Sequence, residues 1–116
     1  MPTPLRVRLD RHVADAHRML ASGDPDRAWA LLEEAHVLSQ PWARAHMRVH
    51  VAMLATAWRT RDRAEFLGQV LRTLVAGPAS LAGRYPEGNT GRASVPATQP
   101  MPVPAELRAL LDLADG

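Results

Sequence analysis

Residues 33–50 read Glu-Glu-Ala-His-Val-Leu-Ser-Gln-Pro-Trp-Ala-Arg-Ala-His-Met-Arg-Val-His. This stretch predicts the end of one helix, a tight corner at residues 39–41 and the beginning of a second helix. His36 lies five residues before Pro41, and His46 lies five residues after it. Positions equidistant from the corner of an antiparallel helix pair lie at about the same height. We therefore expect the rings of His36 and His46 to face each other.

Two further polar side chains extend this pair along the helices. His50 lies one turn beyond His46 on the same helix face, and Glu33 lies about one turn before His36. A Glu-x-x-His pair is used by carboxylate-bridged metal centres in helical bundles, and the His-x-x-x-His spacing can hold one ion. A dinuclear centre of the usual kind needs two Glu-x-x-His pairs and two further Glu. This chain has one such pair, so we predict a mononuclear site with Glu33, His36, His46 and His50 as ligands.

Two side chains of a later helix could support this site. Glu65 and Gln69 lie four residues apart, so they share a helix face and could add a ligand or orient a histidine from behind. A simpler alternative holds for each histidine taken alone. In this alternative, the histidine binds no metal, and its ring bonds to a free backbone carbonyl near the helix corner.

Composition limits the chemistry that such a site can use. The chain has 116 residues, of which 47% are hydrophobic, and this fits one folded domain over residues 1–116. It has no cysteine, which excludes disulfides, thiolate metal sites and thiol catalysis. A metal would be held by nitrogen and oxygen ligands, which suits Zn, Fe, Mn, Co, Ni or Cu(II).

The charged residues argue against several other classes of function. The net charge is only +2, and the acidic and basic residues are interspersed, so the basic stripe of a nucleic-acid-binding protein is missing. All the cationic residues other than histidine are arginines, which excludes Schiff-base chemistry and a phosphate-loop lysine. No motif indicates a nucleotide or an organic cofactor. Without a signal-peptide core or a run of about 20 apolar residues, we expect a soluble cytoplasmic protein with no membrane partner.

Helix-capping signals divide the first two thirds of the chain. We expect Gly23 to end the first helix, Asp24 and Asp62 to cap the second and fourth, and Gly77-Pro78 to stop the fourth. The predicted fold is all-α, an antiparallel four-helix bundle of two helical hairpins that resembles a tetratricopeptide pair, with its helical core at 4–76. The predicted helices span residues 4–22, 25–38, 41–60 and 63–76.

The remainder of the chain is rich in proline and glycine. Residues 77–104 are expected to wrap across the bundle, with a short helical turn at 81–85 and an extended run at 95–104, before a terminal helix at 105–114. Between these lies a loop that contains Gly88, Asn89, Thr90 and Gly91. The loop could act as a lid or cradle an anion, but its pattern is more typical of a tight turn that returns the tail.

Several of these motifs together resemble one known family. The bacterial family catalogued as domain of unknown function 3703 is similar over nearly the whole chain. The segments that carry the resemblance are Leu-Glu-Glu-Ala-His-Val-Leu-Ser-Gln at 32–40, His46, His50, Gly-Gln-Val-Leu-Arg at 68–72, Pro-Glu-Gly-Asn-Thr-Gly at 86–91 and Pro-Met-Pro-Val-Pro at 100–104.

The resemblance implies a small bacterial protein that is sometimes encoded near heavy-metal resistance genes, and it implies no established activity. It also implies that Glu33, His36, His46 and His50 occupy positions of the family pattern. The chain departs from that pattern at Ser39 and Arg92, where glycine is usual. The first change stiffens the corner, and the second bears on any role that needs close backbone approach at residue 92.

Three functions remain open at this point. The first is metal handling or sensing, which predicts a filled coordination shell. The second is a metal-dependent enzyme, which needs an open coordination position and in which Glu33 would be the general base. The third is a metal-free adaptor, a helical-hairpin protein whose exposed apolar groove binds a protein partner. A homodimer could also form through the tryptophans or the leucine-rich last helix.

Overall fold

The computed structural model describes residues 1–83, 85–95 and 99–115, with the backbone alone at 75–80 and 115. These residues form helices and no strand, which confirms the predicted all-α class. No helix among them has the length and apolar character needed to cross a membrane. The helices are α1 Thr3–Ala21, α2 Pro25–Ser39, α3 Ala43–Arg59, α4 Arg63–Leu81 and α5 Ala105–Asp115.

Both aspartate caps form as the sequence predicts. The side chain of Asp24 accepts a hydrogen bond from the backbone N–H of Arg27 at 3.1 Å, and Asp62 accepts one from the N–H of Glu65 at 3.1 Å. Each cap satisfies an amide that would otherwise lack a partner in the first helical turn. Gly23, at φ +87°, follows the end of α1, in the left-handed region that glycine enters without strain.

Two helix boundaries differ from the prediction. α3 begins at Ala43 rather than Pro41, because Trp42 is extended, with φ −118° and ψ 111°. α4 does not stop at 77–78 but continues to Leu81. A proline withholds only one amide from the helical hydrogen bonds, so a helix can continue through it. Gly83, at φ +69°, follows the end of α4. Of the helical turn predicted at 81–85, Arg84 lies outside the described residues.

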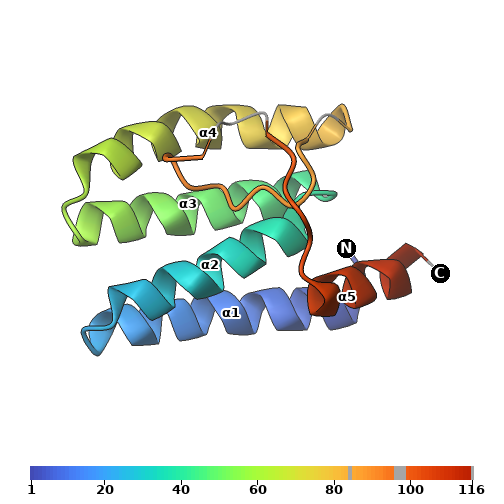
Figure 1. Ribbon diagram of the computed structural model, residues 1–116, viewed down its shortest axis with the longest axis horizontal. Coiled ribbons are helices and arrows are strands. Elements are labelled where there is room, and N and C mark those ends of the chain that lie inside the picture. Colours follow the sequence, from blue (N-terminus) through green and yellow to red (C-terminus); the bar gives the residue numbers. More distant parts are fainter. Residues whose placement is uncertain (84, 96–98, 116) are drawn as a thin grey trace.

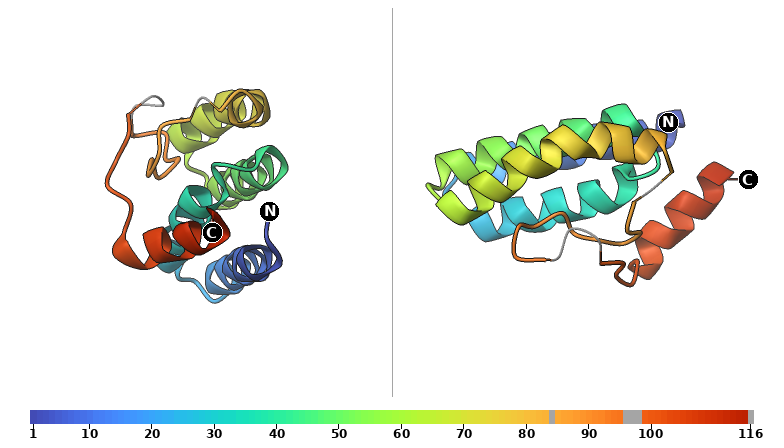
Figure 2. Two further views of the ribbon diagram at one scale, coloured as in Figure 1. Left: turned by 90° about the vertical axis from the view of Figure 1, so that its right-hand side faces the viewer. Right: turned by 90° about the horizontal axis from the view of Figure 1, so that it is seen from above.

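The first four helices lie side by side in chain order, with α2 between α1 and α3 and with α4 against α3 (Figure 1; Figure 2). The main core cluster joins α1, α2 and α3. A second cluster joins α5 to α1 and α2; its buried members are Leu5, Val37, Leu38, Leu107 and Leu111. The finer arrangement, a four-helix bundle of two tetratricopeptide-like hairpins, stays a prediction.

Residues 86–95, here called the strap, lie against α2 and α4. At one end Gln40 holds the strap: its amide donates to the Pro86 carbonyl and accepts from the Gly88 N–H, both at 2.9 Å. At the other end the N–H of Ala93 donates to Glu65 Oε2 at 2.8 Å. Residues 99–104 lead to α5 (Figure 1), and the Met101 N–H bonds to the Glu87 carbonyl beside the strap. Residues 96–98 of the predicted extended run lie outside the described residues.

Candidate metal centre

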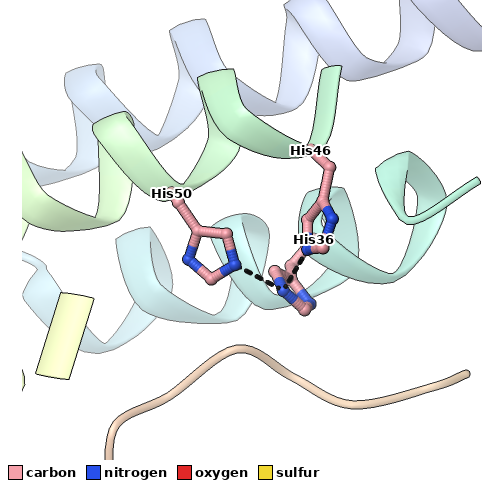
Figure 3. Close-up of side chains that lie close together, drawn as sticks. All are labelled: His36, His46 and His50. Atoms are coloured by element: carbon pink, nitrogen blue, oxygen red, sulfur yellow. Dashed lines mark hydrogen bonds between the residues drawn. The ribbon is translucent and has the colours of Figure 1, made fainter. Parts of the chain in front are cut away.

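Three histidine rings converge between α2 and α3. His36 Nε2 lies 3.0 Å from His46 Nε2 and 3.0 Å from His50 Nε2 (Figure 3). All three side chains are buried, at 3%, 5% and 3% exposure respectively. The predicted meeting of His36 and His46 across the corner is confirmed. It follows from local geometry, since antiparallel helices joined by a tight corner keep equidistant positions level.

The other ring nitrogens of two of these histidines face oxygen acceptors. His36 Nδ1 lies 2.6 Å from the backbone carbonyl oxygen of Asn89, and His50 Nδ1 lies 2.7 Å from Gln69 Oε1. A carbonyl oxygen only accepts hydrogen bonds, so each Nδ1 carries the proton. In the neutral rings, therefore, both Nε2 atoms have a lone pair and no hydrogen.

The orientation of the Gln69 amide is fixed by its neighbours. Its Nε2 donates to Glu65 Oε2 at 2.9 Å and to the Gly91 carbonyl at 2.6 Å. Both of these partners are acceptors, so the oxygen of the amide must be the atom that faces His50. Gln69 thus sets the tautomer of His50, as partners behind metal-bound histidines commonly do. The structure places Glu65 and Gln69 one behind the other, with Gln69 next to the ring.

The protein environment keeps His36 and His50 neutral. Burial lowers the pKa of His36 well below its usual value, and the neighbouring rings of His50 and His46 lower it further. Burial also lowers the pKa of His50, although the hydrogen bond to Gln69 opposes this. The 3.0 Å contact between the two Nε2 atoms is a hydrogen bond only if one ring carries two protons. Two neutral rings in this geometry direct lone pairs toward each other, an arrangement that a bound cation stabilises.

Two of the four loop residues predicted from the sequence, Asn89 and Gly91, lie directly against His36. Asn89 is buried, and its carbonyl accepts the His36 proton. Gly91, at φ +82°, packs so closely on His36 that a Cβ atom there would lie 2.6 Å from His36 Cδ2. Gly88 is buried beside Gln40, and Thr90 is half-buried. The strap passes beside His36 in Figure 3, so the loop forms one wall of the centre.

Glu33 is placed differently from the histidines. The group of described residues whose ligand atoms all lie within 4.8 Å of one another consists of His36, His46 and His50. Glu33 Oε1 instead lies 3.4 Å from Arg92 Nη1. Burial raises the pKa of Glu33, while the charge and hydrogen bond of Arg92 lower it. The structure therefore brings three of the four predicted ligands together, and the role of Glu33 as a ligand stays a prediction.

Arg92 anchors the far end of the strap, a role that the sequence did not reveal. Its guanidinium lies 3.9 Å from the centre of the Trp29 ring, donates to the buried carboxylate of Glu65 and reaches Glu33. Arg72 donates in turn to the carbonyls of Arg92 and Val95. These arginines are isolated in sequence from their partners. The one sequence signal was that Arg92 directly follows the Gly-Asn-Thr-Gly loop.

Two further contacts of this network are not predicted by the sequence patterns, those of the Gln40 side chain and of the Asn89 carbonyl. The sequence predicts Gln40 only as part of the helix corner, yet its side chain is buried and binds the strap at Pro86 and Gly88. The Asn89 contact uses a backbone carbonyl, which has no residue-type signature. The one sequence signal for Gln40 is its position between His36 and His46.

Comparison with known proteins leaves the activity open. No curated protein and no solved structure matches the chain. A family model described as a protein of unknown function, DUF3703, matches residues 4–111. Because this match covers almost the whole chain, the protein belongs to the DUF3703 family.

Proposed function

We propose that this protein binds one divalent transition-metal ion through the Nε2 atoms of His36, His46 and His50, and that it serves in metal handling or sensing. The observation that carries the proposal is the contact between His36 and His50. Their Nε2 atoms lie 3.0 Å apart, while carbonyl oxygens hold the proton of each ring on Nδ1. A metal ion replaces the repulsion between the two lone pairs with two coordinate bonds.

The spacing of the three nitrogens supports this assignment. Zinc binds imidazole nitrogen at about 2.0–2.1 Å in tetrahedral geometry, which separates two ligand nitrogens by roughly 3.3–3.4 Å. The two contacts of His36 Nε2, both 3.0 Å, need to widen by only a few tenths of an ångström. Three imidazoles suit Zn, Co, Ni and Cu(II), and also Fe.

Glu33 is the proposed fourth ligand. It precedes His36 by three residues and therefore lies on the same side of α2. Its carboxylate would have to exchange its contact with Arg92 Nη1 for the metal ion. A cation at the histidines would attract this carboxylate, so metal binding and release of the Arg92 contact would occur together.

The test is direct metal binding by protein purified without a histidine tag. Metal-free protein is titrated separately with zinc, cobalt, nickel and copper, and bound metal is measured by elemental analysis after gel filtration. We expect one ion per chain and, with cobalt, visible absorption bands of a nitrogen-ligated ion. His46→Gln and His50→Gln should each lower the affinity at least about 100-fold, because each removes a metal–nitrogen bond.

The chain offers a matched control for these variants. His17 is exposed on α1, so His17→Gln removes an imidazole without touching the centre and should leave stoichiometry and affinity unchanged. Wild-type protein that retains no metal at equimolar ion would refute the proposal. Equal losses in His17→Gln and His50→Gln would also count against it, since the bound metal would then be at surface histidines.

A second candidate function is supported by a separate observation. A metal-free adaptor needs an exposed apolar surface, and the outer sides of α3 and α4 carry one, with Trp58, Leu71 and Leu74 each more than two-thirds exposed. As a metal-free adaptor, the protein would use α1–α2 and α3–α4 as two tetratricopeptide-like hairpins that present this surface to a protein partner. Absence of metal binding in the titrations, together with normal folding, would favour it.

A further inference from the structure

α4 has two sides of opposite character, and neither is typical of a surface helix. Glu65 and Gln69 face the strap and are buried, at 3% and 0% exposure. Leu67, Leu71 and Leu74 lie on the other side and are exposed at 64%, 68% and 72%. With 3.6 residues per turn, Leu67 is about 200° around the helix from Glu65. The polar side of α4 is thus covered by the strap, while its apolar side faces outward.

The neighbouring helix continues this apolar surface. Met47, Val51 and Trp58 of α3 recur at helical spacing and are exposed at 39%, 50% and 69%. The two rows meet at the corner between the helices. Trp58 packs against Phe66 with ring centres 5.2 Å apart, and Trp58 and Leu67 line one open pocket there. We call this joint surface of α3 and α4 the apolar face.

The size of the apolar face is close to what a stable dimer needs. α4 has 19 residues and is therefore about 28 Å long, and two packed helices are together roughly 20 Å wide. The flat footprint of the two helices is about 560 Å², and the accessible surface of the side chains that protrude from it is larger. A standard interface covers about 800 Å² on each partner.

The charges at the ends of this face favour an antiparallel pairing of identical chains. Arg61, Asp62 and Arg63 line the pocket at the beginning of α4, and Asp62 also caps the helix, so this end carries an excess of basic residues. The other end of α4 is a helix C-terminus, where the helix dipole places partial negative charge. When α4 of one chain packs antiparallel to α4 of a second copy, each arginine pair lies next to the partner's helix C-terminus. A two-fold axis produces this contact twice.

From these observations we propose that the apolar face is a homodimer interface, formed by α3 and α4 of two copies of this chain related by a two-fold axis. Leu71 lies near the middle of α4 and so contacts the partner close to the axis. The strap and the three histidines lie on the opposite side of α4, so both metal centres remain outside the interface. The proposal is therefore independent of metal binding.

The test is the molar mass in solution of wild-type and variant protein, measured by sedimentation equilibrium and by light scattering after gel filtration. At about 100 µM, well above a micromolar dissociation constant, wild-type protein should have about twice the 12.7 kDa chain mass. Leu71→Glu places two carboxylates near the axis and should raise the dissociation constant about 100-fold or more. Because Leu71 is exposed, the variant should keep the wild-type circular dichroism.

A control variant lies on a different surface of the molecule. Val7 of α1 is 51% exposed and outside the apolar face, so Val7→Glu should remain dimeric. Monomeric wild-type protein at this concentration would overturn the proposal and leave the face to a different protein partner. A Leu71→Glu variant that stays dimeric would also overturn it, since the copies would then associate through another surface.

Discussion

His36 Nε2 and His50 Nε2 lie 3.0 Å apart, and each ring donates its Nδ1 proton to a carbonyl oxygen held by a different part of the chain. The strap holds the first ring and α4 holds the second. Both residues therefore present a lone pair toward the same point. This relationship links metal binding, strap contacts and the packing of α4, and substitutions at different residues can separate these contributions.

Replacing Gln69 tests whether the residue behind His50 tunes the metal site. Gln69→Leu keeps the volume but removes the oxygen that receives the His50 proton, so His50 can adopt the other tautomer. We expect metal affinity to fall about 10–100-fold, measured by competition with a chromophoric chelator. Gln99 is exposed, and Gln99→Leu should leave the affinity unchanged. An unaltered affinity in Gln69→Leu would mean that the tautomer of His50 is set elsewhere.

Replacing Gly91 tests the close contact between the strap and His36. A Cβ atom at residue 91 would lie 2.6 Å from the His36 ring, and its φ is +82°. Gly23→Ala is a matched control, because Gly23 has φ +87° but nothing within 4 Å of its Cβ position. The control isolates backbone strain. We expect Gly91→Ala to be less stable than Gly23→Ala by about 1–3 kcal/mol in urea unfolding, and to bind metal more weakly. Equal destabilisation of Gly91→Ala and Gly23→Ala would show that the strap can move away from His36 at no cost in stability.

Arg92 should contribute most of the stability of the far end of the strap. Arg92→Gln leaves the carboxylate of Glu65, whose side chain is 4% exposed, buried without its cation. We expect a loss of about 3 kcal/mol in the free energy of unfolding. Arg108→Gln breaks the exposed ion pair with Glu87 and should cost less than about 1 kcal/mol. If Arg92→Gln and Arg108→Gln lower the free energy of unfolding equally, Arg92 stabilises the protein no more than a surface ion pair does.

Acid should destabilise the metal-free protein through His36 and His50. Both have pKa values lowered by burial, so below about pH 6.5 the unfolded chain binds protons that the folded protein does not. Stability is therefore fully present above pH 6.5 and falls as the pH decreases, by up to about 1.4 kcal/mol per pH unit for each histidine. Urea unfolding at several pH values measures the slope. His50→Gln should reduce it, and an unchanged slope would contradict this assignment.

Local sequence signals determined the helical architecture and the meeting of the histidines. Asp24 and Asp62 cap the helices as predicted, because capping depends on residues within one turn. His36 and His46 meet because a short corner fixes which residues of two adjoining helices are level. These contacts join residues near one another in the chain, so a pattern of a few residues is enough to predict them.

Only the tertiary structure decided which groups surround His36 and His46. The Asn89 carbonyl reaches His36 across 53 positions and Arg92 reaches Glu33 across 59, and no local pattern specifies the path of the strap that brings them there. The same path gives Glu33 a cationic partner and covers the polar side of α4, which turns Leu67 and Leu71 outward. The physical reason is that buried polar groups must find hydrogen-bond partners wherever the folded chain supplies them. Helix periodicity identifies such groups, but the packing of the whole chain selects their partners.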